Sequence, residues 1–539
     1  MLLRNVLAAF LDSLPDERAL DLPFLALLSD MGFEDVHFTH GQAEFGKDFI
    51  AKRLEGGEMV QFSFQSKAGD IGQGPWRTEI MPQMLEAVVS GLSHPRFDRN
   101  LPHQAILVLS GRLKGNAAVA VQDFNQKLEG KYTERGVDIW DQERLIEYFI
   151  TNGPDSFYNF DDAGLAGYGA FLTNYGQALR GELTAPEIER HSRAWISAAA
   201  PLAKMFEGVL EAELLAAAYT RHGRTYEALV CLLAQLRAVL VLLHRVPDGN
   251  ESQLRDFCAA SRARVAQLAD AHLSSVLECQ GSPADLFGAV DGGAVIATYP
   301  IQCARAAESA ALLFFLGEAP VRVRASAALV QLSEEPGLAH PVSDRSAASI
   351  VLACLALMAD GQQQRALELV KRTTLWVADR YERGFGLAEF DASPMRELDL
   401  LLGFPFAGVR AEKRSGSLLA TALCDLAAFG GDHQVYCDVV NELLAVQIAF
   451  QYYQPRDTLG QFVLDGDDVL QYPNVEYDEE PSRFTDAKFA NHIANEERTF
   501  KLVGSVGAQS YAALMLLLRD RYFPLLWPAL VTAADAKNS

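Results

Sequence analysis

The sequence predicts an α/β domain with a mixed sheet, followed by a large all-α region. Up to about residue 150, short strand-like apolar runs alternate with helical patterns, and beyond it the apolar periodicity is almost wholly helical. The stretch between them, 151–162, gathers Gly, Pro, Asn and Asp, as connectors do. A chain of 539 residues also exceeds the usual size of one hydrophobic core. We therefore expect two domains, residues 1–155 and residues 156–539.

The predicted elements of the first domain begin with helices. Residues 1–20 have an amphipathic helical pattern, and 20–33 reads as a helix that ends near Gly32. A strand over 34–40 and a hairpin over 46–67 come next. The remaining elements, in chain order, are a helix over 76–92, a strand over 103–110, a helix over 116–130, a strand over 137–141 and a helix over 142–149. This order describes a sheet with an antiparallel hairpin on one side, flanked by helices.

The hairpin is predicted in register from its turn. Gly56 and Gly57 suit a two-residue loop, because both central positions of such a turn take a positive φ that glycine adopts freely. That loop places Asp48 directly opposite Gln65, with Cβ atoms about 5 Å apart. Lys67, two residues beyond Gln65 on the same strand, projects from the same face. The sequence thus brings a carboxylate, an amide and an ammonium together.

The two faces of the hairpin differ in polarity. The apolar face carries Phe49, Ala51, Val60, Phe62 and Phe64, and the polar face carries Asp48, Lys52, Gln61, Ser63, Gln65 and Lys67. We expect the first face to lie in the core and the second to face water. This alternation is typical of a half-exposed sheet, so it is compatible with a structural ion pair as well as with a functional cluster.

Several motifs around this hairpin have the order seen in one nuclease family. They are GF (32–33), GQAEFGKDFI (41–50), QSK (65–67), GDI (69–71), HQAILVLSGRLKGNA (103–117) and VDIWDQERLIEYF (137–149). This set resembles the Mrr-like branch of the PD-(D/E)XK restriction-endonuclease superfamily, over about residues 10–150 and none of the helical region. The resemblance implies a restriction-endonuclease-like fold in the first domain and metal-dependent hydrolysis of phosphodiester bonds.

The resemblance also implies roles for particular residues. Asp48 would bind Mg²⁺ or Mn²⁺, Gln65 would offer an oxygen at or near the metal, and Lys67 would orient the attacking water and offset transition-state charge. Glu44 is an additional candidate acid on the approach to Asp48. The family often has a glutamate in its first helix, and the matching position here is Asp21. This chain departs from the family pattern at two positions: Gln65 lacks the charge of the usual acid, and Asp21 is shorter than the usual glutamate.

The charge of the chain limits how it could bind nucleic acid. A net charge of −23 excludes a general polyanion binder, so contact with DNA, or with RNA, would have to be local and metal-assisted. The candidate phosphate contacts are Lys47, Lys52, Arg53, Arg77, Arg112 and Lys114. Each of them can equally be a solvated surface charge.

The second domain reads as a succession of helices with short polar breaks. Antiparallel helix pairs of the tetratricopeptide-like kind are expected, although no repeat of fixed period is found. The acidic stretch 464–483 is predicted to be a surface loop. The most apolar run, 229–246, is broken by Gln235 and Arg237, which favours a buried helix over a membrane span.

Other features narrow the class of protein. The seven cysteines include no C-x-x-C pair, which indicates a reduced protein without a zinc framework, and the N-terminal segment lacks the pattern of a signal peptide. No P-loop motif is present, so no built-in ATP motor is expected. A cytoplasmic protein that does not engage a membrane is predicted.

Two functions are compatible with these patterns. One is a Mg²⁺-dependent endodeoxyribonuclease, which by analogy would be a bacterial antiphage defence effector whose helical region senses a trigger, binds a protein partner or oligomerises. Because cutting a duplex usually needs two active sites, a homo-oligomer of at least two chains is expected. The other is a non-catalytic binding module in which the nuclease fold is carried on a helical protein-interaction scaffold.

Overall fold

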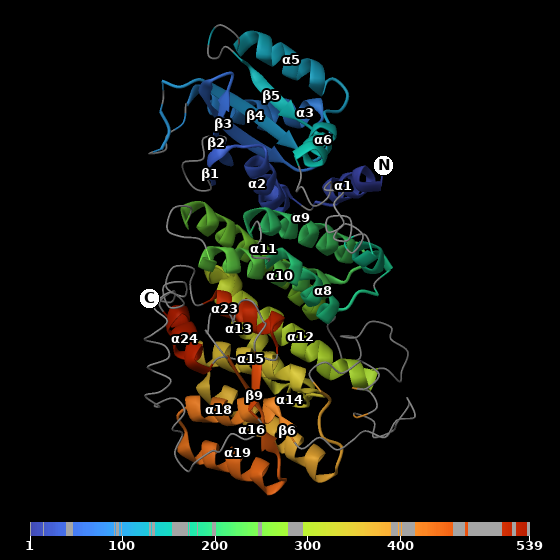
Figure 1. Ribbon diagram of the computed structural model, residues 1–539, viewed down its shortest axis with the longest axis vertical. Coiled ribbons are helices and arrows are strands. Elements are labelled where there is room, and N and C mark those ends of the chain that lie inside the picture. The colour runs from blue at the N-terminus through green and yellow to red at the C-terminus, as the bar shows by residue number, and fades with distance from the viewer. Residues whose placement is uncertain are drawn as a thin grey trace. The chain divides into compact units, whose positions relative to one another are not determined.

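The computed structural model divides the chain into two compact units, Met1–Ser261 and Arg262–Ser539. Figure 1 shows the course of the chain through its helices and strands. The structure describes residues 2–14, 16–38, 47–90, 92, 96–98, 100–128, 131, 135–152, 171, 173–180, 182–196, 201–245, 251–278, 295–389, 397, 400, 416–455, 469–472, 509–519 and 524–535. The first unit contains the predicted α/β domain together with the first helices of the helical region.

A five-stranded mixed sheet forms the centre of the α/β part. Its strands, listed in their spatial order, are β1 (Glu34–Phe38), β2 (Phe49–Glu55), β3 (Glu58–Lys67), β4 (His103–Leu109) and β5 (Val137–Trp140). The first three strands are antiparallel, and β3, β4 and β5 are parallel to one another. The predicted mixed sheet with an antiparallel hairpin on one side is confirmed.

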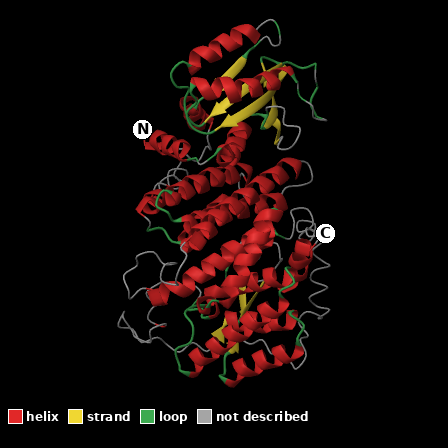
Figure 2. Cartoon of the chain, turned by 180° about the vertical axis from the view of Figure 1, so that it is seen from behind, coloured by secondary structure: helices red, strands yellow, loops and turns green. Residues whose placement is uncertain are grey.

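Helices cover both faces of this sheet (Figure 2). The helices of this part of the chain are α1 (Leu2–Ser13), the 3₁₀ turn η1 (Glu17–Leu20), α2 (Asp21–Asp30), α3 (Gln73–Pro75), the π-helical turn η2 (Trp76–Ile80), α4 (Met81–Val89), α5 (Ala117–Leu128) and α6 (Gln142–Asn152). On one face, Phe24 of α2 packs edge-on against Phe49, Phe64 and Trp140, with ring centroids 5.4–6.1 Å apart. Burial of these large rings is a main source of stability for the sheet.

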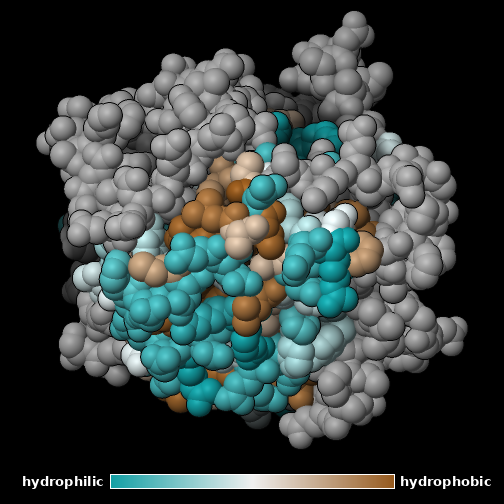
Figure 3. All heavy atoms as spheres, turned by 90° about the horizontal axis from the view of Figure 1, so that it is seen from below, coloured by the Kyte–Doolittle hydropathy of each residue, from teal (hydrophilic) through white to brown (hydrophobic). Residues whose placement is uncertain are grey.

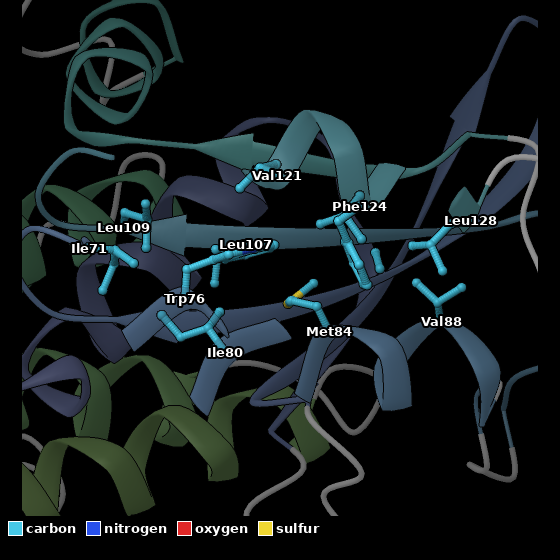
Figure 4. Close-up of a cluster of buried hydrophobic side chains, with 12 residues drawn as sticks. Ile71, Trp76, Ile80, Met84, Val88, Leu107, Leu109, Val121, Phe124 and Leu128 are labelled. Atoms are coloured by element: carbon cyan, nitrogen blue, oxygen red, sulfur yellow. The ribbon is translucent and has the colours of Figure 1, made fainter. Parts of the chain in front are cut away.

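The opposite face packs beneath η2, α4 and α5. On this face Leu107 and Leu109 of β4 gather with Trp76 of η2, Met84 of α4 and Phe124 of α5, and the rings of Trp76 and Phe124 meet edge-on with centroids 5.7 Å apart (Figure 4). These residues belong to one cluster of buried apolar side chains, which gives this face of the parallel strands a continuous core.

The turn of the hairpin has the predicted conformation and register. Gly56 and Gly57 have φ values of 58° and 88°. Glu55 pairs with Glu58 and Phe49 pairs with Phe64, so each residue of β2 faces the partner that the two-glycine loop assigns to it. The register of the hairpin is therefore confirmed.

Gly57→Ala should destabilise the first unit by about 1 kcal/mol, because a non-glycine residue pays roughly that cost in the left-handed region. No atom lies within 4 Å of the Cβ position at Gly57, so the expected cost comes from backbone conformation and not from a clash. Urea unfolding of the variant measures it. Gly74→Ala is the matched control, since Gly74 has an equally open Cβ position but lies in a helical turn without a positive φ. Equal stability of the two variants would contradict this account.

The polar face of the hairpin does not face water as the sequence suggested. Gln61, Ser63 and Gln65 are 1%, 1% and 5% exposed. The reason is tertiary: in register with Ser63 and Gln65, this face continues into Ala105 and Leu107 of β4, which the helices cover. The buried polar groups have partners, because the Gln61 amide accepts from the main-chain N–H of Asp98 (3.1 Å), which lies before β4, and also donates to the Asp98 carbonyl.

Further helices complete the first unit. They are α8 (Ala185–Ser192), the 3₁₀ turn η4 (Arg193–Ile196), α9 (Pro201–Thr220) and α10 (Thr225–Arg245), and α11 (Glu251–Glu278) continues past residue 261. Within α10, Thr225–Leu243 is long and apolar enough to cross a membrane by length and composition, and it is fully buried. Arg237 on this helix is 0% exposed and its guanidinium pairs with Glu189 of α8 at 2.8 Å. The prediction of a buried helix is confirmed.

The second unit is mostly helical. Its described helices are α12 (Val295–Leu316), α13 (Ala319–Glu334), α14 (Pro336–Ala339), η6 (Asp344–Ser346), α15 (Ala347–Ala359), α16 (Gln363–Glu382), α18 (Leu418–Phe429), α19 (His433–Ala445), α23 (Ser510–Leu517), η8 (Pro524–Leu526) and α24 (Trp527–Asp535). The predicted helix pairs are seen in α15 with α16 and α18 with α19, where Gly361 and Gly431 end the first helix with φ values of 75° and 72°. In the view of Figure 3, hydrophilic side chains cover most of the described surface, with smaller hydrophobic areas among them.

Short strands make the all-α prediction for this region incomplete. The parallel pair β6 (Gly416–Ser417) and β7 (Ala449–Phe450) and the antiparallel pair β8 (Tyr452–Pro455) and β9 (Val469–Tyr472) form two small sheets. β9 lies inside the stretch 464–483 that was predicted to be a loop, and the rest of that stretch lies outside the described residues. Aromatic and β-branched residues in β8 and β9 favour this pairing, which the surrounding acidic composition concealed.

Candidate functional site

Asp48 and Gln65 meet across the hairpin, as their register requires. The Gln65 side-chain amide donates from Nε2 to Asp48 Oδ2 at 2.8 Å, and the main-chain N–H of Ser66 donates to the same oxygen at 2.6 Å. The main-chain N–H of Asp48 in turn donates to the Phe64 carbonyl at 2.8 Å. Asp48 is 9% exposed and Gln65 is 5% exposed. Two hydrogen bonds to one oxygen stabilise the ionised carboxylate in this nearly buried position.

Lys67 ends the same strand and pairs with an acid that the sequence did not single out. Its Nζ lies 3.7 Å from Oε1 of Glu17, and the Lys67 side chain is 21% exposed. That separation is an ion pair but is too long for a hydrogen bond. Glu17 begins the turn η1, fifty residues before its partner, and no local pattern relates the two positions.

The other two candidate acids differ in what the structure shows of them. Asp21, the position carried over from the first helix of the resembling family, opens α2 and is 9% exposed. Glu44 lies outside the described residues. Among the described residues the acid paired with Lys67 is Glu17. Counting back from Gly32-Phe33 points to Asp21 and so could not have found it.

The donor set at Asp48 fits a divalent cation that keeps most of its water. A Gln side chain can turn so that its oxygen replaces its nitrogen, and Asp48 with Gln65 would then offer one carboxylate and one amide oxygen. Mg²⁺ is commonly held by one or two carboxylates and several waters. Among the described residues there is no group of three or more His, Cys, Asp or Glu that could hold a metal ion. Of the described residues, Asp48 and Gln65 are the pair that would hold such a cation.

Four of the predicted phosphate contacts are already paired with acids. Lys52 Nζ lies 2.9 Å from Asp35 Oδ2, and Lys114 Nζ lies 3.3 Å from Asp70 Oδ2. Arg53 and Arg112 form ion pairs with Glu55 and Glu143, respectively. The Arg53 guanidinium also lies 4.3 Å from the ring centroid of Phe33, which gives it a structural role in the hairpin.

The last two basic candidates, Lys47 and Arg77, differ from this group. Lys47 is only 4% exposed, and burial lowers the pKa of its ammonium, an effect that Glu86 on α4 partly offsets. Lys47 is therefore too buried for the predicted contact with a phosphate at the surface. Arg77 is exposed on η2, so its side chain is accessible.

A half-buried histidine that the sequence did not single out lies further along this polar face. The Nε2 atom of His103, on β4, lies 2.9 Å from the hydroxyl of Ser63. Burial lowers the pKa of the His103 imidazole to about 4, and the nearby charge of Lys47 acts in the same direction. His103 is therefore neutral at physiological pH.

The low pKa of His103 should make the first unit less stable in acid. Since the folded-state pKa lies below the ordinary 6.5, the unfolded chain takes up the proton first, and stability is lost as pH falls from about 6.5 towards 4. The slope contributed by this group is at most about 1.4 kcal/mol per pH unit. Urea unfolding between pH 7 and 4.5 should show a shallower slope for His103→Gln than for wild type. His433→Gln, at an exposed position on α19, serves as the control, and equal slopes for wild type and His103→Gln would refute the assignment.

No family model, curated protein or solved structure matches this chain in comparisons with known proteins.

Proposed function

We propose that the α/β part of the chain is a metal-dependent endonuclease of the Mrr-like PD-(D/E)XK type that hydrolyses phosphodiester bonds of DNA. The observation that carries the proposal is the contact between Asp48 and Gln65, with Lys67 ending the same strand. An aspartate at the start of one strand and Q-x-K on the next is the motif of that branch. The sheet of this chain, in which an antiparallel hairpin leads into parallel strands, is compatible with the fold of that nuclease branch.

Each side chain has a definite part in this proposal. Asp48 and Gln65 would hold Mg²⁺ or Mn²⁺, which when bound supplies a nucleophilic water and offsets negative charge. The oxygen of that water forms a bond to phosphorus as the bond from phosphorus to the leaving ester oxygen breaks. The water loses a proton to solvent and the leaving oxygen gains one. The Lys67 ammonium would donate to the attacking water or to a phosphate oxygen as charge develops there.

The net charge of the chain and the number of chains in the assembly would determine how such an enzyme binds DNA. The chain has a net charge of −23, and Lys52, Arg53, Arg112 and Lys114 are paired with acids, so contact with the DNA backbone would be confined to the neighbourhood of the site. Cleavage of both strands would require a homo-oligomer of at least two chains. By analogy, the helical region would bind a protein partner or a trigger in a cytoplasmic antiphage defence system.

A non-catalytic binding module is the second candidate, and one observation favours it. Asp48 Oδ2 already accepts two hydrogen bonds, and no group of three or more His, Cys, Asp or Glu that could hold a metal ion is found among the described residues. A domain that has lost metal-dependent chemistry could retain this arrangement as a structural link between β2 and β3.

Incubating the purified protein with plasmid DNA and with RNA, in Mg²⁺, in Mn²⁺ and in EDTA, separates the two candidates. We expect cleavage that requires the metal and that is lost in both Asp48→Asn and Lys67→Met. Cleavage that persists in both variants would show that Asp48 and Lys67 do not form the active site. If wild type binds DNA but cuts neither substrate in either metal, the binding module is the better account. RNA cleavage without DNA cleavage would change the substrate class and leave the site in place.

A further inference from the structure

We propose that Arg4 and Arg112 together bind a phosphate group of the DNA backbone, beyond the carboxyl ends of the parallel strands. The inference rests on the proposed function for its ligand and deepens it, because it adds Arg4 of α1, a residue that the sequence did not single out. Four observations carry it.

The first observation is that two guanidinium groups share one acid. Arg4 pairs with Oε2 of Glu143, and Arg112 pairs with Oε1 of the same carboxylate. Among the described residues, no other acid pairs with either arginine. Two positive charges and one negative charge leave a local excess of one positive charge, on a chain whose net charge is −23. Such an excess favours an anion as the third partner.

The second observation is that both arginines are accessible. Their side chains are 49% and 50% exposed, and that of Glu143 is 47% exposed. Nη2 of each arginine contacts Glu143, so Nε and Nη1 are the donors that a phosphate oxygen would meet. A guanidinium presents these donors in a planar fork that matches the oxygens of phosphate.

Other shared acids of the α/β part do not offer this arrangement. Two of them are each paired with two cations, namely Asp35 with Lys52 and Arg96, and Glu55 with Arg53 and Arg135. In each of these clusters one cation is embedded in the hairpin, since the Lys52 and Arg53 side chains are 16% and 27% exposed and lie over aromatic rings. Two half-exposed arginines meet at Glu143 instead.

The third observation is the place of Arg112. The loop after β4 runs along the loop after β3, because the N–H of Ser110 donates to the Lys67 carbonyl at 3.1 Å and the N–H of Ile71 donates to the Arg112 carbonyl at 2.9 Å. The Ser110 hydroxyl also accepts from the N–H of Gly69 at 2.8 Å. The main chain that carries Arg112 is thus joined to the strand end that carries Lys67. A DNA backbone that reaches this strand end therefore comes close to Arg112.

The fourth observation is that Arg4 is held at this place by the packing of α1 against α6 (Figure 1). Glu143 lies in the first turn of α6. Beside it, Gln142 donates from Nε2 to Oδ1 of Asp12 on α1 at 2.6 Å, and its N–H donates to the Gly111 carbonyl at 2.9 Å. These contacts join α1, α6 and the loop after β4, so the two guanidiniums are positioned before a ligand binds, which lowers the entropic cost of binding.

The test measures binding of a fluorescently labelled DNA duplex to the full chain by fluorescence anisotropy, in Ca²⁺ and in EDTA, between about 50 and 200 mM salt. Arg4→Met and Arg112→Met should each weaken binding about tenfold at the lowest salt and reduce the slope of log K against log salt by about 0.9, because each phosphate contact releases about one counterion. Arg4→Lys should keep the wild-type slope, since the slope counts charges. The folds should survive, because exposed ion pairs contribute little to stability.

Arg180→Met is the matched control for the loss of one positive charge. Arg180 belongs to the same unit, its side chain is 60% exposed, and it pairs with an acid of its own, Glu182, at 2.8 Å. We expect the affinity and the salt slope of this variant to equal those of wild type. A decrease as large as in Arg4→Met would show that net charge alone matters and would overturn the inference.

The remaining outcomes separate this inference from the proposed function. If wild type binds DNA and both Arg4→Met and Arg112→Met keep its affinity and salt slope, the inference is wrong and the nuclease proposal stands. Binding that depends on both arginines, without cleavage of plasmid DNA in Mg²⁺ or Mn²⁺, would support the phosphate site and contradict the proposed activity. Wild type that binds no DNA in Ca²⁺ or in EDTA would overturn the inference, and the cleavage assay would then decide on the nuclease independently.

Discussion

Asp48→Asn should lower metal-dependent cleavage by at least about 100-fold, the scale on which removal of one electrostatic contact to a developing charge acts. The carboxylate is the charged oxygen ligand that the site offers, and asparagine keeps its shape while removing its charge. Both hydrogen bonds can persist in this variant, because an amide oxygen in the place of Oδ2 can accept from the Ser66 N–H and from the Gln65 amide. Initial rates on plasmid DNA at saturating Mn²⁺ measure the loss.

The choice of asparagine over alanine matters for this experiment. Asp48→Ala would leave the Gln65 amide and the Ser66 N–H without their acceptor, at a cost of about 1–3 kcal/mol for each buried donor. Loss of activity in that variant could follow from a damaged hairpin. Thermal unfolding of Asp48→Asn should stay near that of wild type. A rate within a factor of a few of wild type would show that Asp48 does not take part in cleavage.

Arg519→Met should destabilise the second unit by about 3–5 kcal/mol, as is usual when one partner of a buried ion pair is removed. Arg519, which follows α23, donates from Nη1 and Nη2 to the two carboxylate oxygens of Glu308 on α12, both at 2.7 Å. Glu308 is 1% exposed and also accepts a hydrogen bond from Ser349 of α15. Without Arg519, this buried carboxylate would lose a bidentate cationic partner.

The matched control for this prediction is Arg324→Met. Arg324 pairs with Asp270 within the same unit, but its side chain is 49% exposed, so its loss should cost less than about 1 kcal/mol. Chemical denaturation of both variants gives the comparison. The double variant Glu308→Gln with Arg519→Met should recover part of the stability, because the unpaired charge is then gone. Similar stabilities for Arg519→Met and Arg324→Met would contradict the importance of the buried pair.

The turn and the register of the hairpin could be predicted from the sequence because the information for them is local. The two glycines determine the loop, the loop determines the register, and the register places Asp48 against Gln65. The succession of helices and strands along the α/β part could be predicted for a similar reason, since short apolar runs and helical periods alternate along the chain. The paired helices of the second unit follow from the same helical periods.

What could not be predicted depends on contacts between distant segments. The burial of Gln61 and Ser63 comes from Asp98 and His103, which lie some forty residues away along the chain. Glu17 reaches Lys67 only because α2 packs on the sheet and carries the preceding turn with it. Alternating polarity along a strand predicts that its polar residues face water, but a neighbouring element can cover them. For this reason the exposure predicted for Gln61 and Ser63 was wrong.

The two-glycine turn has a consequence for how this site could change over time. Asp48 and Gln65 lie on different strands, and the length of the loop between those strands sets which of their residues meet. Inserting one residue beside Gly56 would turn Asp48 towards the aromatic face, and inserting two would restore its face but move it away from Gln65. Substitutions in this loop affect mainly stability, whereas insertions and deletions would separate the fold from its candidate chemistry.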